Sequence, residues 1–274
     1  MGFVAHGLHV LIGNDAAEHR WVADVRTDIH SAVKGVCALA LGCAEDDGLL
    51  WLDAPAASLF PDLVPGAGTE TVTLRHLITM SSGVDFPWTP TLMTDWPDLA
   101  LEFLRRPSPA RAFQYSNAST YTAMRALATV VGDVGDYINK RLLHPLGIQG
   151  AMWERCPLGF VVAGSGLALR TEELARIGRL VRDNGRWGGE QILDPKWPRA
   201  LHSDWVNAGV SPGYQRYAFA GWDGPGDTWR LHGAYGQLVI FSGAVIVTIT
   251  ASDHERADPL ARRIAKHLQR TAIN

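Results

Sequence analysis

The chain has 274 residues, of which 47% are hydrophobic and 19% are charged, a balance typical of a soluble globular protein with one substantial core. Its net charge is −3 and no stretch is strongly basic, which argues against nucleic acid or an anionic membrane as a partner. No segment reaches the ~20 apolar residues of a membrane span, and the N-terminus lacks a signal-peptide pattern, so we expect a cytoplasmic protein.

The first part of the chain predicts a hairpin followed by a helix. The hairpin comprises Leu8–Ile12 and Arg20–Val25, joined by a turn at Gly13-Asn14-Asp15. A helix should begin near Ile29 or His30 and run to about Cys43, because apolar residues recur there at helical spacing.

The middle of the chain reads as helical. Thr73 is a predicted cap for a helix over Leu74–Met80, with Gly83 as its C′ residue. The Pro-, Thr- and Trp-rich segment Phe86–Asp95 predicts a loop over a pocket. Further helices are expected from Pro97 to Leu104, over Ser119–Val131, over Asp133–Leu143, and from Thr171 to Gly185.

The C-terminal part predicts an antiparallel meander and a last helix. The expected strands are Trp229–Gly233, Gln237–Phe241 and Val245–Thr250. Asp258 is the predicted N-cap of a helix that runs to about Arg270. Strands at both ends of a chain most simply pair into one sheet. We therefore expect one α+β (α/β) domain over 1–274, with a sheet lobe (1–45 and 160–274) and an inserted helical lobe (46–159).

The cysteines do not indicate a metal site. Cys37, Cys43 and Cys156 are odd in number and form no C-x-x-C pair, so buried reduced thiols are the expected state. A zinc site is therefore not expected.

Ser31 and Lys34 are the first candidate site residues. Residues three apart share a helical face, so both side chains should project from the first turn of the predicted helix. The unpaired N–H groups of that turn can hold an oxyanion, and an amine beside a serine hydroxyl is a candidate base. The alternative is a surface serine beside a solvated lysine.

Tyr115 and Asn117 are the next candidates, in the loop before a predicted helix. A phenol near a lysine can relay a proton from Ser31 to a leaving group. Asn117 can orient Lys34 and donate an amide N–H to a substrate carbonyl. Alternatively, Tyr115 packs in the core and Asn117 caps the helix.

The segment Leu231–Gln237 supplies a third group of candidates. Its glycines allow a ligand to approach the backbone closely, and an N–H of an edge strand can be a second oxyanion donor. The alternative is an ordinary hairpin in which Gly236 makes the turn and His232 is half-buried.

Together these pieces resemble the serine β-lactamase and penicillin-binding protein superfamily. Ser31-x-x-Lys34 is similar to its first motif, Tyr115-Ser116-Asn117 to the Tyr-x-Asn motif of its class C branch, and His232-Gly233 stands at the third. Three connecting segments also resemble that branch, which includes esterases: Leu74–Gly83, Pro145–Ile148 and Gly166–Arg176.

The resemblance implies a β-lactamase-like fold and a serine hydrolase that forms an acyl-enzyme on Ser31. Lys34 and Tyr115 would share the acid and base roles, and the N–H groups of Ser31 and Ala234 would form the oxyanion hole. This mechanism would need no metal and no organic cofactor. Asn117, His232, Gly233 and Tyr235 would contact the substrate, a small-molecule ester or amide.

One departure from the family pattern affects the expected substrate. The third motif has no Lys-Thr-Gly, and in the family that lysine helps to bind a substrate carboxylate. Arg230 or His232 is a possible substitute, but an esterase or amidase suits the sequence better than a β-lactamase.

Two alternatives stay open at this point. One is a transacylase, in which an amine or alcohol replaces water and Phe86, Trp88 and Trp96 exclude water from the cleft. The other is a non-catalytic binding protein of the same fold. The sequence does not indicate an oligomeric state.

Overall fold

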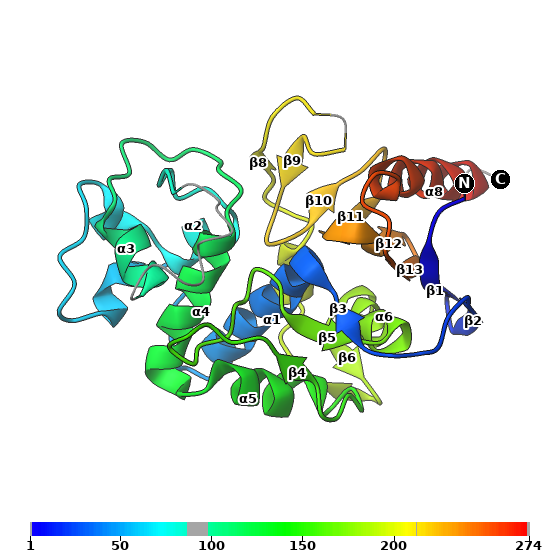
Figure 1. Cartoon of the computed structure of the whole chain (residues 1–274), viewed down its shortest axis with the longest axis horizontal. Coiled ribbons are helices and arrows are strands. Elements are labelled where there is room, and N and C mark those ends of the chain that lie inside the picture. The colour runs from blue at the N-terminus through cyan, green and yellow to red at the C-terminus, as the bar shows by residue number, and fades with distance from the viewer. Residues whose placement is uncertain (1, 87–97, 212, 273–274) are drawn as a thin grey trace.

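The computed structural model describes residues 2–86, 98–211 and 213–272. A sheet lobe and a helical lobe lie side by side, with helix α1 between them (Figure 1). The elements up to the middle of the chain are β1 (Ala5–Ile12), β2 (Asp15–Arg20), β3 (Thr27–Asp28), η1 (His30–Ala32), α1 (Val33–Asp46), η2 (Ala56–Leu59), η3 (Thr69–Thr71), α2 (Leu74–Ile78), α3 (Leu99–Arg105), α4 (Asn117–Val131), α5 (Val134–Ile138) and the π-helical turn η5 (Asn139–Leu143).

The remaining elements complete the sheet and its helices. They are β4 (Met152–Trp153), β5 (Leu167–Leu169), α6 (Thr171–Arg182), β6 (Arg186–Trp187), β7 (Glu190–Gln191), α7 (Lys196–Ala200), β8 (Val206–Asn207), β9 (Arg216–Tyr217), β10 (Trp222–Asp223), β11 (Trp229–Gly233), η6 (Ala234–Gly236), β12 (Gln237–Ser242), β13 (Val245–Ala251) and α8 (Ala257–Ala272). Within the described residues the main sheet has the strand order β2-β1-β13-β12-β11-β10-β9-β8.

The two ends of the chain meet in this sheet, as predicted. Strand β1 pairs antiparallel with β13, and β13 continues through β12 to β11. The predicted N-terminal hairpin is present, but its second strand is β2 rather than Arg20–Val25. The reason is that Ile12 and Asp15 already pair across the turn, so the returning strand begins there.

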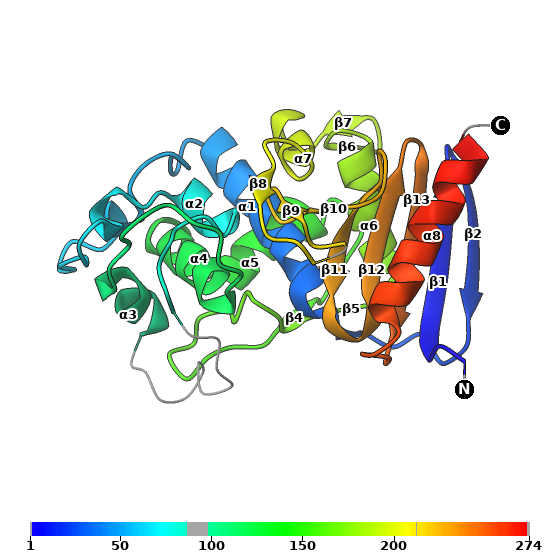
Figure 2. The ribbon, with the colours of Figure 1, turned by 90° about the horizontal axis from the view of Figure 1, so that it is seen from above.

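Strand β12 is buried on both faces. Leu238 and Ile240 face one side with the apolar side chains of α8, while Val239 and Phe241 face the main core. Figure 2 shows α8 lying across the sheet. On the other face, Gly178 of α6 packs closely against Val239. This two-sided burial explains why the strand is a continuous apolar run.

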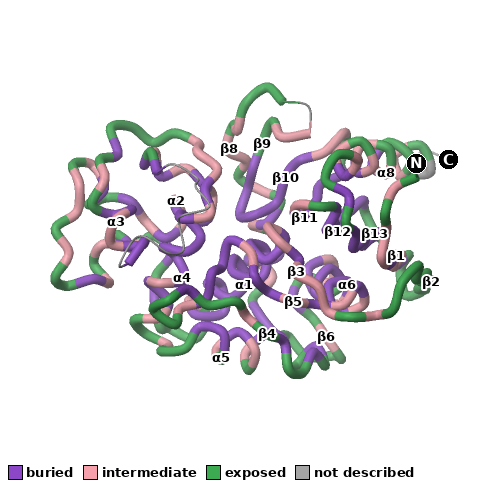
Figure 3. The backbone as a smooth tube through the Cα atoms, in the orientation of Figure 1, coloured by how far each residue is buried: buried purple, intermediate pink, exposed green. Residues whose placement is uncertain are grey.

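Helix α1 is the centre of the molecule. Its residues from Val33 to Ala44 are buried (Figure 3). Small residues allow neighbours to approach closely: a Cβ added at Gly35 would meet Leu231, and one at Gly42 would meet Trp197. Since α1 touches both lobes, a residue at its N-terminus lies where the lobes meet.

The helical lobe follows most of the predictions. Thr73 caps α2 in a reciprocal pair with His76. Gly83 is not the C′ residue of this helix, because α2 already ends at Ile78 and Met80 has the nearest positive φ, +58°. The predicted loop Phe86–Asp95 and the residues Trp88, Trp96 and Pro97 lie outside the described residues, except for Phe86, which is buried.

The last helix differs from the prediction at its start. Helix α8 begins at Ala257, so Asp258 lies inside its first turn and is not the N-cap. Cys37, Cys43 and Cys156 are free and buried, as predicted. Burial raises the pKa of the Cys37 thiol to about 12, which leaves it unreactive. Among the described residues, every helix is too short or too polar to cross a membrane.

Candidate active site

Ser31 lies in the tight turn η1, between β3 and α1. The Asp28 carboxylate holds this turn: its Oδ1 accepts the backbone N–H groups of His30 and Gly166, each at 2.8 Å. His30 has φ +47°, an uncommon conformation for a residue with a side chain. Such strain is often found at functional sites, where the surrounding contacts maintain it.

Lys34 is almost fully buried, with 1% of its surface exposed. Its Nζ lies 2.9 Å from Ser31 Oγ, 2.7 Å from Asn117 Oδ1 and 2.9 Å from the Gly164 carbonyl oxygen. Ser31 and Lys34 come from one helical turn, whereas Asn117 begins α4 and Gly164 precedes β5. The arrangement therefore joins three distant segments around one amine.

Tyr115 lies against this amine. Lys34 Nζ is 5.0 Å from the centroid of the Tyr115 ring, which packs against Tyr217 and Trp222. Both Tyr115 and Ser31 line the same cavity. Within the described part of the chain, the Tyr115 hydroxyl makes no hydrogen bond, so it is free to contact a ligand there.

Strand β11 closes the other side of the turn. A Cβ at Gly233 would lie 2.2 Å from the Ile29 carbonyl oxygen and 3.1 Å from the Ala32 nitrogen. Only glycine permits this approach, which brings Ala234 to the cavity beside Ser31. Tyr235 follows with φ +61°, lines the cavity and packs between the rings of His30 and His254.

The cavity has a volume of about 370 Å³, enough for a small molecule. Its lining residues come from both lobes and from α8: Ser31, Tyr115, Tyr214, Trp222, His232, Ala234, Tyr235, His254, Ala257 and Asp258. Of the predicted site residues, Lys34, Asn117 and Gly233 do not line it and instead support those that do.

His232 is buried beside Asp258 and is uncharged at neutral pH. Burial is the main cause that lowers the pKa of His232 to about 3; the nearby Arg230 charge adds to it and Asp258 opposes it. Arg230 Nε donates to His232 Nδ1 at 3.1 Å, so the ring proton belongs on Nε2, which lies 3.4 Å from Asp258 Oδ1.

The sequence predictions missed several residues of this site. Asp28 and Gly164 organise Ser31 and Lys34, while Tyr214, Trp222, His254 and Asp258 line the cavity. Only Asp258 carried a sequence signal, which indicated a helix cap. The others stand in loops or short strands without periodicity.

A larger groove, of about 1160 Å³, lies on the outer face of the sheet between β1, β13 and α8. Mostly aliphatic side chains line it, and none of the predicted site residues reaches it. The predicted site residues that line a cavity therefore line the smaller one. Within the described ranges, no group of His, Cys, Asp and Glu side chains is arranged to hold a metal ion.

Comparison with known proteins agrees with this geometry. The family model described as Beta-lactamase matches residues 3–269. No curated protein matches the sequence.

Solved structures of similar fold include three with different assigned activities. A candidate 6-aminohexanoate-dimer hydrolase from Bacillus anthracis has TM-score 0.80 and 18% identity, over 97% of this chain and 80% of that one. A class C beta lactamase from Rhodobacter sphaeroides has TM-score 0.77 and 16% identity, over 99% and 95%. A family VIII carboxylesterase has TM-score 0.73 and 14% identity, over 97% and 93%. At these identities the likeness shows the fold.

Proposed function

The chain belongs to the beta-lactamase family, and from this premise we propose that it is a serine hydrolase that forms an acyl-enzyme on Ser31 and cleaves a small-molecule ester or amide. One observation carries the proposal: the amine of Lys34 lies 2.9 Å from Ser31 Oγ, at the wall of a cavity. A nucleophile within hydrogen-bond reach of a base is the arrangement that acyl transfer requires.

Lys34 is the proposed base for acylation. A neutral amine keeps two N–H donors, which suit Asn117 Oδ1 and the Gly164 carbonyl. Its lone pair is then directed at the Ser31 hydroxyl, from which it takes the proton as Oγ attacks the substrate carbonyl. No carboxylate is among these three contacts of Lys34.

The cavity walls supply the other proposed roles. The N–H groups of Ser31 and Ala234 stabilise the oxyanion of the tetrahedral intermediate. Tyr115, whose ring centroid lies 5.0 Å from Lys34 Nζ, passes the proton to the leaving alcohol or amine as the carbon–oxygen or carbon–nitrogen bond breaks. Water then attacks the acyl-enzyme, loses its proton to the same pair, and releases a carboxylic acid and the Ser31 hydroxyl.

Arg230 does not support a β-lactamase-like carboxylate site. Its guanidinium is 5% exposed and does not line the cavity, because it donates to the backbone carbonyls of Gly213 and Asp223. The arrangement therefore favours esters and amides that lack an anionic group.

The test is to incubate the protein with a panel of p-nitrophenyl esters and to follow the intact mass. We expect an adduct of the mass of the acyl group, located on Ser31 by peptide mapping, and none in Ser31→Ala. The matched control Ser58→Ala, at an exposed serine, should form the adduct as the unmodified protein does.

Other results would contradict this function. Full esterase activity in Ser31→Ala would exclude the mechanism, and a folded protein that no ester acylates would indicate the binding-protein alternative. Adding a primary amine or alcohol separates the transacylase alternative, since an amide or a new ester then replaces the free acid as product.

A further inference from the structure

The cavity beside Ser31 carries one acidic side chain, that of Asp258. Among the described lining residues there is no lysine, arginine or glutamate. The Asp258 side chain is 39% exposed, so it is accessible from the cavity. It lies in the first turn of α8, whereas Ser31 belongs to η1, so the two reach the same space from different elements.

Among the described residues, the contacts of the Asp258 carboxylate are with Tyr214 and His232, and not with a lysine or an arginine. The Tyr214 hydroxyl donates to Oδ1, and His232 Nε2 lies 3.4 Å from the same oxygen. The Tyr214 hydroxyl is a neutral donor. The His232 ring is also neutral, because its Nδ1 accepts the hydrogen bond from Arg230 Nε and so carries no proton. Oδ2 has no partner among the described residues.

Arg230 is a cation behind the cavity wall: it contacts His232 through Nδ1, the ring nitrogen opposite the one near Asp258, and its guanidinium carbon lies 5.0 Å from the centroid of the Tyr214 ring. Its other N–H groups donate to the Asp223 carbonyl at 3.2 Å and the Gly213 carbonyl at 2.6 Å. The guanidinium thus faces the backbone behind the cavity wall, and a ligand in the cavity meets the carboxylate first.

Aromatic rings form much of the remaining wall. Tyr115, Tyr214, Trp222 and Tyr235 all line the cavity. Trp222 contacts Tyr214 edge-on, with centroids 4.8 Å apart, and Tyr115 at 5.6 Å. The faces of such rings attract cations, and a set of them beside a carboxylate is the chemistry that recognises ammonium groups.

We infer that the cavity binds a cationic group, and that the substrate of Ser31 is an ester or amide of an ammonium-bearing compound with Asp258 as its charge partner. This inference rests on the proposed function and names its substrate class. The ammonium can belong to the acyl part or to the leaving group, and the experiment separates the two.

The experiment compares substrates of equal shape that differ only in charge. On the acyl side, the p-nitrophenyl ester of γ-trimethylammoniobutyric acid is paired with the ester in which carbon replaces the ammonium nitrogen. On the leaving-group side, acetylcholine is paired with its neutral carbon isostere. In at least one pair, kcat/KM for the cation should exceed that for the neutral isostere by about tenfold.

Variants then assign the effect to the carboxylate. Asp258→Asn should remove most of this preference. Asp227→Asn changes net charge equally at an exposed turn outside the cavity and should retain it.

The inference fails if neither pair shows a preference for the cation in the unmodified protein, a result that needs no variant. It also fails if Asp258→Asn keeps the preference, or if Asp227→Asn loses as much of it. Failure of the proposed function looks different, because the neutral esters would then leave no acyl group on Ser31 either.

Discussion

Among single residues, Lys34 has the most demanding environment. It is buried at 1% exposure, yet its contacts are neutral: a hydroxyl, an amide oxygen and a backbone carbonyl. Such a position is consistent with the proposed role of accepting a proton from Ser31.

Replacing Lys34 by methionine should slow acylation of Ser31 by roughly 10²–10⁴-fold, because the base is removed while the side-chain length is kept. Burst kinetics with a p-nitrophenyl ester measure this step. Lys196→Met, at a lysine that is 51% exposed, is the matched control and should acylate normally. A folded Lys34→Met protein that acylates within a factor of a few of the unmodified rate would refute the role.

Among elements, the contact between β11 and η1 has the tightest geometry. A Cβ at Gly233 would meet backbone atoms of Ile29 and Ala32, which cannot move as a flexible side chain can. Ala234 directly follows the strand and Ser31 lies in the turn. The distance between strand and turn therefore determines whether both proposed oxyanion donors, the N–H groups of Ala234 and Ser31, reach one oxygen.

Gly233→Ala should therefore displace β11 and lower the free energy of unfolding by about 1–3 kcal/mol, because the added Cβ overpacks the contact. The rate of acylation should fall by roughly 10²-fold, because one oxyanion donor is displaced. Gly243→Ala is the control, because a Cβ at this position would lie within 4 Å of no atom. The φ angle of Gly243 is +54°, so alanine is strained there without any clash. This variant should lose about 1 kcal/mol of stability and acylate normally. Thermal unfolding and burst kinetics on both variants test this, and equal acylation by the two would contradict it.

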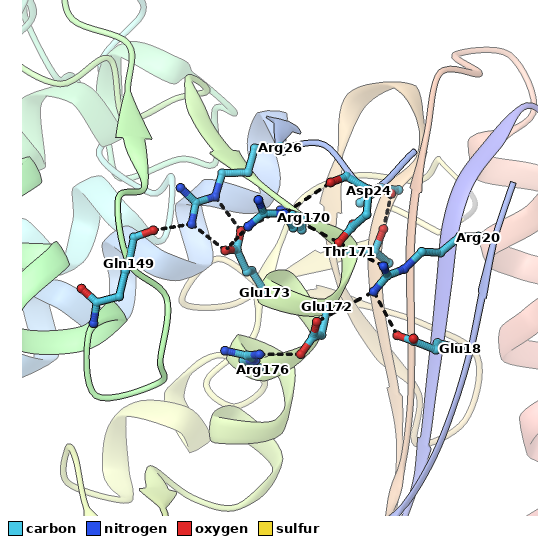
Figure 4. A network of polar contacts seen from close by, with 11 residues as sticks. Glu18, Arg20, Asp24, Arg26, Gln149, Arg170, Thr171, Glu172, Glu173 and Arg176 are labelled. Carbon is cyan, nitrogen blue, oxygen red and sulfur yellow. Dashed lines mark hydrogen bonds and ion pairs between the residues drawn. The ribbon is translucent and has the colours of Figure 1, made fainter. Parts of the chain in front are cut away.

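Across the whole molecule, an ion-pair network joins segments that are distant in sequence (Figure 4). Glu173, in the first turn of α6, accepts hydrogen bonds from Arg26 and from the backbone N–H and side chain of Arg170. Arg26 also donates to the backbone carbonyls of Gln149 and Gly150. The chain entering β3, the loop before β4 and the start of α6 are thereby held together. Strand β3 in turn leads into η1, which contains Ser31.

Glu173 also makes stability depend on pH. Burial would raise the pKa of this carboxyl, but the hydrogen bond from Arg26, the Arg170 N–H and the two positive charges together lower it below the ordinary 4.5. Because the folded pKa lies below the unfolded one, this contribution is fully present above 4.5 and is lost as pH falls through the folded value.

Glu173→Gln should lower the free energy of unfolding by about 2 kcal/mol at neutral pH. Its stability should also fall less on acidification, because the titrating group is gone. Urea unfolding between neutral pH and about pH 3 measures both effects. Glu172→Gln, at a neighbour that is 39% exposed, should change stability little. Equal losses in the two variants would show that burial of Glu173 contributes nothing.

Sequence alone predicted what depends on local periodicity. Ser31 and Lys34 are three residues apart in one helical turn, so their proximity follows from helix geometry. The strands Trp229–Gly233 and Val245–Thr250 were predicted from runs of β-branched and apolar residues between glycines. Because the run Val245–Thr250 is mostly apolar, the sheet to which it belongs must be covered by other elements. The family resemblance, carried by ordered motifs, is confirmed by the match over residues 3–269.

Only the tertiary structure decided which residues surround that pair. Gly164 reaches Lys34 across 130 positions of chain, and Asp258 reaches the cavity from a helix whose sequence signal indicated a cap. Helix and strand propensities describe the backbone conformation of a residue, but they do not say which distant residue it contacts. Those contacts depend on how the helices and strands pack, and one local sequence pattern is compatible with many packing partners. The proposed nucleophile Ser31 and the nearby amine of Lys34 were therefore predictable from sequence, while the charge and shape of the cavity beside Ser31 required the fold.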